Sequence, residues 1–192
     1  MEKLLILIGG PNGCGKSSLY EGIRSRKTPL PYLNADLIAV ASQGIQGAHG
    51  EVNAGRIMLR QLSSAIKEDR SIAIETTMSG RMWVKIINNA KAKGYKITSV
   101  FVTIDTVEKS IARIAERKRR GGHAIPDDTV RRRWKRCHYN FLQSYRRISD
   151  SWYIFDNSKN GAVLIAQKTS DKFRVFNEGV LKRIEEYGKT AN

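Results

Sequence analysis

The residues with the clearest chemical potential form one short loop near the start of the chain. They fill the pattern G-x-x-x-x-G-K-[ST] at every fixed position, and with the residue that follows they are Gly10, Pro11, Asn12, Gly13, Cys14, Gly15, Lys16, Ser17 and Ser18. Glycines in such a loop let backbone N–H groups approach phosphate oxygens closely. The lysine reaches the β- and γ-phosphates, and the adjacent hydroxyl, here that of Ser17, ligates Mg²⁺. The pattern predicts that residues 10–18 bind ATP or GTP together with Mg²⁺.

The flanking residues provide the context that this loop needs. Residues 3–8 are an apolar run of strand length, and residues 18–23 are typical of a helix start. A loop between a strand and a helix directs the positive end of the helix at bound phosphate. A chance glycine turn is the alternative, and the complete motif in this position argues against it.

Two carboxylates follow predicted strands. Asp36 comes just after the short apolar stretch 32–34, and Glu75 directly follows the strand at 71–74, with Thr76 and Thr77 next. Ligands of parallel sheets bind outside the carboxyl ends of the strands, so we expect Asp36 and Glu75 at the site. The alternatives are helix capping by Asp36 and, for Glu75, a carboxylate that caps a helix or only orders Mg²⁺-bound water.

Positive charge is concentrated in one segment. The chain has 34 Lys and Arg against 18 Asp and Glu, a net charge of +16, and residues 113–136 contain ten basic and three acidic residues. Two explanations compete: a nucleic-acid footprint, or a lid that closes on nucleotide phosphates across the glycine pair Gly121-Gly122. Composition alone does not separate them.

The rest of the chain predicts an α/β fold. Strands are expected at 3–8, 32–34, 71–74, 97–104 and 152–155, with a loop at 42–50, a helix from Asn53, an added edge strand at 162–166 and a last helix at about 176–187. The five principal strands with helical crossovers predict a three-layer, mostly parallel sheet covered on both faces. We expect one domain over residues 1–192, with the basic lid inside it.

Other features exclude several classes of protein. The N-terminal apolar run is too short for a signal peptide or a membrane span, so a cytoplasmic protein without membrane association is expected. Cys14 and Cys137 are isolated thiols without metal-ligand spacing to a histidine. They indicate a reduced compartment.

Together these short motifs resemble the zeta toxin family of P-loop kinases, in particular its short stand-alone bacterial branch. The matching segments follow the family's order from residue 3 to about 158. They are residues 10–17, Asn34-Ala35-Asp36, Ala54-Gly55-Arg56, Glu75 to Gly80, Gly121-Gly122-His123 with Pro126, Arg132-Arg133 and Asp156-Asn157-Ser158. No segment after the first is specific to the family by itself, but the segments taken together are.

The resemblance implies ATP-dependent phosphorylation of a hydroxyl group, in the best-known members on UDP-N-acetylglucosamine. It assigns phosphate binding to Lys16 and base catalysis to Asp36. It places Glu75, Thr76 and Thr77 on the substrate side, and Asn157 beside the adenine. It also implies charge neutralisation by lid arginines, most plausibly Arg117, Arg120 and Arg133. A separate antitoxin partner is left open, and the alternative function is a nucleic-acid-binding P-loop protein such as a polynucleotide 5′-kinase.

Overall fold

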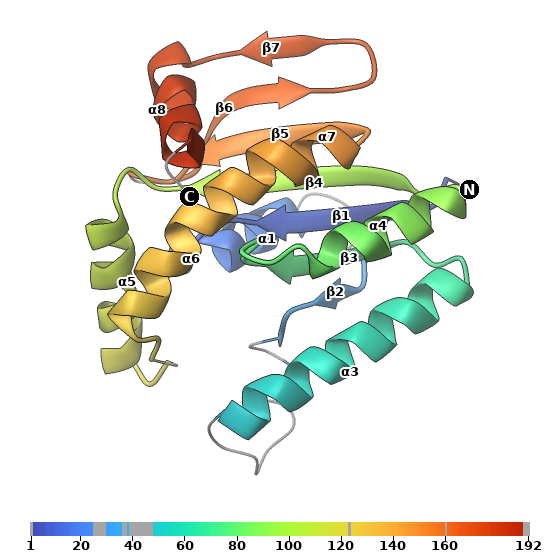
Figure 1. The fold of residues 1–192 in the computed structure, drawn as a ribbon, viewed down its shortest axis with the longest axis horizontal. Helices are drawn as coiled ribbons and strands as arrows, with labels where there is room; N and C mark the ends of the chain where they lie inside the picture. The colour runs from blue at the N-terminus through green and yellow to red at the C-terminus, as the bar shows by residue number, and fades with distance from the viewer. Residues whose placement is uncertain are drawn as a thin grey trace.

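A seven-stranded sheet forms the centre of the computed structural model, which describes residues 2–24, 30–35, 38, 48–122, 124–159 and 161–189 (Figure 1). The spatial order of the strands is β2-β3-β1-β4-β5-β6-β7. Their bounds are β1 Leu4–Gly9, β2 Tyr32–Leu33, β3 Ile72–Thr76, β4 Lys96–Thr103, β5 Ser151–Asp156, β6 Val163–Lys168 and β7 Phe173–Val175.

The first five strands are parallel, as predicted. β1 pairs with β3 on one side and β4 on the other, β2 extends the sheet beyond β3, and β5 beyond β4. All their carboxyl ends therefore lie at one edge, which brings residues from distant parts of the sequence together. β6 forms at about the predicted place and runs antiparallel to β5, but the prediction of an edge strand is wrong, because β7 pairs with the other side of β6. β7 was not predicted, because a three-residue strand with exposed Phe173 and Arg174 has too little alternation to be recognised.

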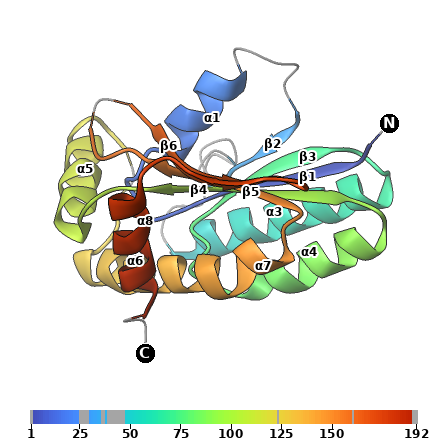
Figure 2. The same cartoon turned by 90° about the horizontal axis from the view of Figure 1, so that it is seen from above.

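Helices cover both faces of the sheet, which confirms the three-layer prediction. Figure 2 shows α1 on one face, with α3, α4, α6, α7 and α8 on the other. The helices are α1 Lys16–Arg24, α3 Ala48–Lys67, α4 Met82–Ala92, α5 Val107–Arg119, α6 Asp127–Asn140, α7 Arg146–Ile148 and α8 Glu178–Lys189, with a π-helical turn, η1 Phe141–Tyr145, between α6 and α7. None of the helices in the described part of the chain is long and apolar enough to cross a bilayer.

Two helix starts differ from the prediction. α3 begins at Ala48, so residues 48–50 of the expected loop are helical, while residues 42–47 lie outside the described part. The prediction missed this start because Gly50 is typical of a loop, although a glycine inside a helix lowers its stability by only about 1 kcal/mol. α8 begins at Glu178 rather than near Phe176, because the Asn177 Oδ1 accepts the Val180 N–H (3.0 Å) and caps the helix there.

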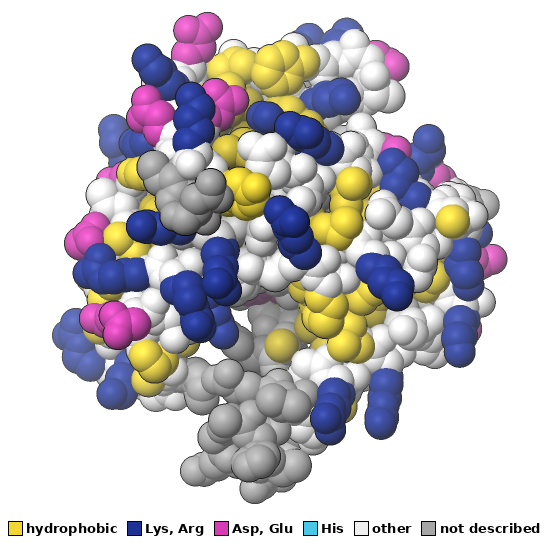
Figure 3. All heavy atoms as spheres, in the orientation of Figure 1, with side chains coloured by type: hydrophobic (Ala, Val, Ile, Leu, Met, Phe, Trp, Pro, Cys, Tyr) yellow, Lys and Arg dark blue, Asp and Glu magenta, His cyan; other side chains and the backbone are white. Residues whose placement is uncertain are grey.

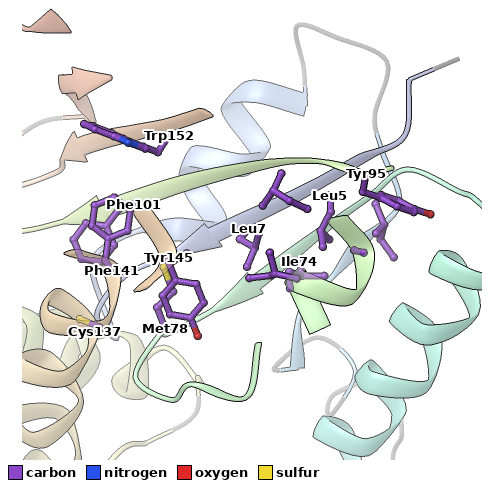
Figure 4. Packing of buried hydrophobic residues seen from close by; sticks show 14 of the residues in the cluster. Leu5, Leu7, Ile74, Met78, Tyr95, Phe101, Cys137, Phe141, Tyr145 and Trp152 are labelled. Atoms are coloured by element: carbon purple, nitrogen blue, oxygen red, sulfur yellow. The ribbon is translucent and has the colours of Figure 1, made fainter. Parts of the chain in front are cut away.

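The hydrophobic core has one cluster on each face of the sheet. Leu5, Leu7, Ile74 and Phe101 pack under α3, α4 and α6 (Figure 4). Ile8, Ala73, Val100 and Val102 face α1 with Tyr20, among others. Residues that alternate along β1 thus enter opposite clusters, and burial on both faces explains why the parallel strands are almost continuously apolar.

One polar side chain lies deep within this core. His138 on α6 is completely buried. Its Nδ1 lies 2.8 Å from the Trp134 carbonyl oxygen, so this nitrogen carries the proton and donates, while Nε2 accepts from the Thr103 hydroxyl at 3.0 Å. Burial lowers the pKa of His138 from 6.5 to about 4, so the imidazole is neutral at pH 7.

Candidate functional site

The glycine-rich loop joins β1 to α1 and requires its glycines. Gly10, Gly13 and Gly15 have φ values of 140°, 74° and 91°. A Cβ atom at Gly10 would lie 2.0 Å from the Val102 carbonyl oxygen, and one at Gly15 would lie 2.3 Å from Nδ2 of Asn157. The loop can therefore adopt this tight path only with glycine at these positions.

Lys16 is buried inside this loop. Its Nζ donates to the carbonyl oxygens of Gly10 (3.2 Å) and Pro11 (2.9 Å), and it lies 3.9 Å from Oε1 of Glu75. The Asn12 side-chain oxygen is also buried and has no hydrogen-bond partner among the described residues. The loop thus holds an ammonium group and an unpaired polar atom, as expected of a site that a polar ligand completes.

Glu75 is the centre of a hydrogen-bond cluster beside the loop. Its Oε2 accepts from the Ser17 hydroxyl (2.8 Å), from Asn34 Nδ2 (3.0 Å) and from the Tyr32 hydroxyl. Burial, followed by the nearby Glu75 charge, raises the pKa of Tyr32, which keeps its hydroxyl protonated as a donor. Neighbouring parallel strands β2, β3 and β1 bring these groups together. Tyr32 and Asn34 were not predicted as site residues, although Tyr32 lies in β2 and Asn34 directly follows it, two residues before Asp36.

These oxygens suit Mg²⁺. Magnesium prefers hard oxygen ligands and is commonly held by one or two protein oxygens, with phosphate and water completing the octahedron. The Ser17 hydroxyl and the Glu75 carboxylate are adjacent and accessible from the loop. No group of three His, Cys, Asp or Glu side chains within the described ranges could bind a metal alone. Ser17 and Glu75 therefore fit a magnesium ion that shares its other ligands with a nucleotide.

Two of the other predicted acceptor-side residues, Thr76 and Thr77, border Glu75. Asp36 lies outside the described residues. Thr76 and Thr77 follow Glu75 at the end of β3; the Thr76 hydroxyl accepts the Met78 N–H (3.1 Å), and the hydroxyls of Thr77 and Ser79 lie 2.8 Å apart. These hydroxyls therefore line a tight polar turn at the carboxyl edge of the sheet.

An open cavity lies along α5 and is linked to the other side of the loop through Asn157. It has a volume of about 420 Å³, and its lining consists of Arg113, Glu116, Arg117, Arg120, Gly121 and Gly122. Asn157 connects it to the loop, since its Nδ2 donates to the Cys14 carbonyl (2.8 Å) and its own carbonyl accepts from Arg113 Nη2 (2.9 Å). Arg113 was missed as a site residue; its i, i+4 spacing to Arg117 was the available signal.

The predicted lid arginines lie on two helices. On α5, Arg117 lines the cavity, and Arg120 pairs with Glu116 at 2.9 Å. Arg133 lies half-buried on α6 and, like Arg132 and Arg136, has no carboxylate partner among the described residues. Figure 3 shows dark blue side chains gathered over α6 beside a recess in this face. The structure thus supplies basic groups from two helices, α5 and α6.

Solved structures share this fold at low sequence identity. The chain matches the crystal structure of AvrRxo1-ORF1:-ORF2 with ATP at a TM-score of 0.77 and 16% identity, over 95% of this chain and 63% of that one, so it spans less than two thirds of that protein. It matches the PezAT toxin–antitoxin system of Streptococcus pneumoniae at a TM-score of 0.63 and 14% identity, over 99% and 85% of the two chains. It also matches the Pnkp1/Rnl/Hen1 RNA repair complex at a TM-score of 0.59 and 19% identity, over 74% and 46%.

Sequence comparisons identify the family. An uncharacterized protein of Haemophilus influenzae is 29% identical over 134 residues, which cover 70% of this chain and 94% of that protein. The model of the family described as zeta toxin matches residues 39–179. This match begins after the glycine-rich loop and Asp36, so it is independent of both. With its P-loop kinase-like sheet and the match over most of its length, the chain belongs to the zeta toxin family.

Proposed function

We propose that this protein is an ATP-dependent kinase that transfers the γ-phosphate to a hydroxyl group of a small molecule, either a nucleotide sugar similar to UDP-N-acetylglucosamine or a related metabolite. One observation carries the proposal: Ser17, Lys16 and Glu75 meet at the glycine-rich loop. This is the set of groups that phosphoryl transfer requires beside a nucleotide. Membership of the zeta toxin family and the fold shared with a protein crystallised with ATP support it.

The proposed role of each site residue follows from its position. Residues 10–18 bind the phosphates, and Lys16 exchanges its loop carbonyls for phosphate oxygens. Ser17 and Glu75 hold Mg²⁺, which would supply charge neutralisation at the phosphates. Asn157, with Arg113, borders the nucleotide side, where the α5 cavity offers room for the base.

Phosphoryl transfer then needs a positioned hydroxyl and cations. Asp36 accepts the acceptor's hydroxyl proton as its oxygen bonds to the γ-phosphorus, and the bond from phosphorus to the β,γ-bridging oxygen breaks to release ADP. Thr76 and Thr77 border the acceptor from the end of β3. Arg117, Arg120 and Arg133 neutralise charge on the transferred group; Arg120 must leave Glu116 to do so.

The test is ATP consumption by the purified protein with UDP-sugars, nucleosides and 5′-hydroxyl oligonucleotides as acceptors. Lys16→Ala is the inactive control, and mass spectrometry identifies the product. A UDP-sugar that gains one phosphate in the wild type alone is the expected result. Failure of every small acceptor, with turnover on the oligonucleotide, would overturn the acceptor class.

The second candidate is a polynucleotide 5′-kinase or RNA binder. Two observations favour it: the net charge of +16 and the fold shared with the Pnkp1/Rnl/Hen1 RNA repair complex. Oligonucleotide binding at two salt concentrations separates the candidates. Saturable binding that depends on ATP and falls steeply with salt would support this second function, because phosphate contacts release counterions.

A separate protein partner also belongs to the proposal. The PezAT structure is that of a toxin–antitoxin system, and AvrRxo1-ORF1 was crystallised with ORF2. By analogy we expect an antitoxin that restrains this chain, and a cytoplasmic location in which both ATP and the acceptor are available.

A further inference from the structure

The turn that follows Glu75 is held by two hydrogen bonds from a distant part of the chain, one buried and one partly buried. Asn140 Nδ2, at the end of α6, donates to the Met78 carbonyl oxygen (2.9 Å). The Tyr145 hydroxyl, at the end of η1, donates to the Gly80 carbonyl oxygen (2.5 Å). Both donors are buried, and more than sixty residues separate them from the turn. These bonds are therefore tertiary links between the C-terminal edge of β3 and the α6–η1 segment.

The turn is strained at the residue that Asn140 contacts. Met78 has a φ of 54°, a left-handed conformation that residues with a side chain rarely adopt. Its side chain fills the space above Gly9, where a Cβ atom would lie 2.2 Å from Met78 Sδ. Such strain persists only where the surroundings fix the backbone, and it is concentrated at functional sites. The strain here lies three residues after Glu75.

The π-helical turn explains how one helix reaches both carbonyls. In an α-helix, side chains five positions apart point about 140° away from each other. A π-helical turn spreads more residues over each turn and so brings positions i and i+5 to nearly the same side. Asn140 and Tyr145 are five positions apart; Asn140 immediately precedes η1, and Tyr145 is its last residue. Figure 4 shows Tyr145 beside Met78, in agreement with this arrangement.

The same face of α6 carries Arg133. Arg133 and Asn140 are seven positions apart, or two helical turns, so they share a face and lie about 10 Å apart along the helix axis. A rigid helix thus fixes the distance between the turn at Met78 and the arginine.

We propose that Asn140 is a positioning residue, which ties the acceptor side of the pocket to the helix that carries Arg133 by holding the strained turn at Met78. The inference rests on the proposed function for its kinetic consequence. Its structural part, the restraint of residues 76–83, is independent of any acceptor.

Hydrogen exchange of the ligand-free protein tests the structural part. Asn140→Leu keeps the approximate side-chain volume but removes the donor, so backbone amides in residues 76–83 should exchange at least about tenfold faster. Tyr145→Phe removes only the hydroxyl and should accelerate exchange of the same amides by a smaller factor. This variant keeps the test available if Asn140→Leu folds poorly. Gln143→Leu is the matched control, because this amide lies exposed on the same segment and contacts Arg147. Unchanged exchange in both test variants, or equal acceleration in the control, would overturn the proposal.

Kinetics with UDP-N-acetylglucosamine as acceptor test the positioning role. Because a displacement of about 1 Å can cost 100-fold in rate, kcat in Asn140→Leu should fall at least about tenfold while the KM for ATP stays within about twofold. Combined with Arg133→Ala, the loss should be smaller than the product of the single losses, since both changes act on one geometry. Multiplicative losses, or parallel changes of kcat and the KM for ATP, would indicate a general structural role instead. If the wild type does not phosphorylate UDP-N-acetylglucosamine, the proposed acceptor is wrong. The hydrogen-exchange experiment then tests by itself whether Asn140 restrains residues 76–83.

Discussion

The Ser17 hydroxyl donates to Oε2 of Glu75 over 2.8 Å, which joins the glycine-rich loop of β1 to the end of β3. Glu75→Gln should therefore weaken the use of Mg²⁺, because an amide oxygen carries no charge for the ion. We expect the apparent KM for Mg²⁺ to rise about 10- to 100-fold, measured as ATP turnover across a magnesium titration. Glu68→Gln, an exposed carboxylate beside Arg70, is the control. An unchanged magnesium dependence would remove Glu75 from the metal site.

Asp36→Asn tests the proposed base. A positioned base contributes about 100- to 10,000-fold, so the phosphotransfer rate should fall by at least about 100-fold. Asp69→Asn is a suitable control, since Asp69 lies in a left-handed turn that asparagine also tolerates and pairs only with Lys3 among the described residues. A rate within a factor of about three of the wild type would show that another group accepts the proton.

Gly15→Ala should impair nucleotide binding. Gly15 has a φ of 91°, and the added Cβ would displace Asn157 Nδ2 from the Cys14 carbonyl. Strain of about 1–3 kcal/mol in the loop corresponds to a rise in the Kd for ATP of roughly 5- to 150-fold, which calorimetry can measure. Gly22→Ala in α1 has open space around its Cβ and should leave the Kd unchanged. Equal affinities of Gly15→Ala and the wild type would contradict the assignment of the loop.

Arg113→Ala should weaken ATP binding without changing the acceptor side. Its Nη2 supports the Asn157 carbonyl, and its side chain lines the cavity beside α5. Loss of a charge-assisted hydrogen bond of about 1.5–3 kcal/mol predicts a Kd for ATP raised roughly 10- to 150-fold. Lys118→Ala, exposed on the same helix, is the control. If both variants bind ATP like the wild type, the base does not occupy this cavity.

His138 should make stability depend on pH. Its pKa is about 4 in the folded protein and 6.5 when unperturbed, so between these values the unfolded chain binds more protons. The stabilisation from a neutral His138 is fully present above pH 6.5 and is lost as the pH falls to about 4 and below. It amounts to roughly 3 kcal/mol of unfolding free energy.

Urea unfolding at several pH values measures this dependence. His138→Gln can still donate to Trp134 and accept from Thr103, but it does not titrate, so the slope between pH 4 and 6.5 should flatten. A slope equal to that of the wild type would assign the acid sensitivity to other groups.

The sequence was most informative where a motif and a periodic pattern agree. The apolar runs of β1, β3, β4 and β5 and the loop at residues 10–18 specify both the parallel sheet and the edge at which the site lies. Glu75 could be assigned to the site for the same reason. The hydrogen-bond partners of Glu75 could not be predicted. Tyr32, Asn34 and Ser17 contact Glu75 because β2, β3 and β1 are neighbours in the sheet, and the sequence does not give this spatial order.

Long-range hydrogen bonds could not be predicted from the sequence for a related reason. The bond from Asn140 to Met78 depends on the π-helical turn after Asn140, and nothing in the local residue types distinguishes that turn from a continuing α-helix. Arg113 was likewise not singled out, because its i, i+4 spacing to Arg117 recurs elsewhere in the same basic segment.

The short outer strands of the sheet have a consequence for behaviour at high concentration. β2 has two residues and β7 three, and Lys172 and Arg174 place positive charge at the β7 end. An unpaired strand edge invites pairing with another chain, but so few backbone groups offer little to a second copy, and at β7 the two positive charges repel a like edge. The apolar centre of the sheet is thereby shielded from stacking edge to edge with other molecules, and concentrated solutions should resist fibrous self-association.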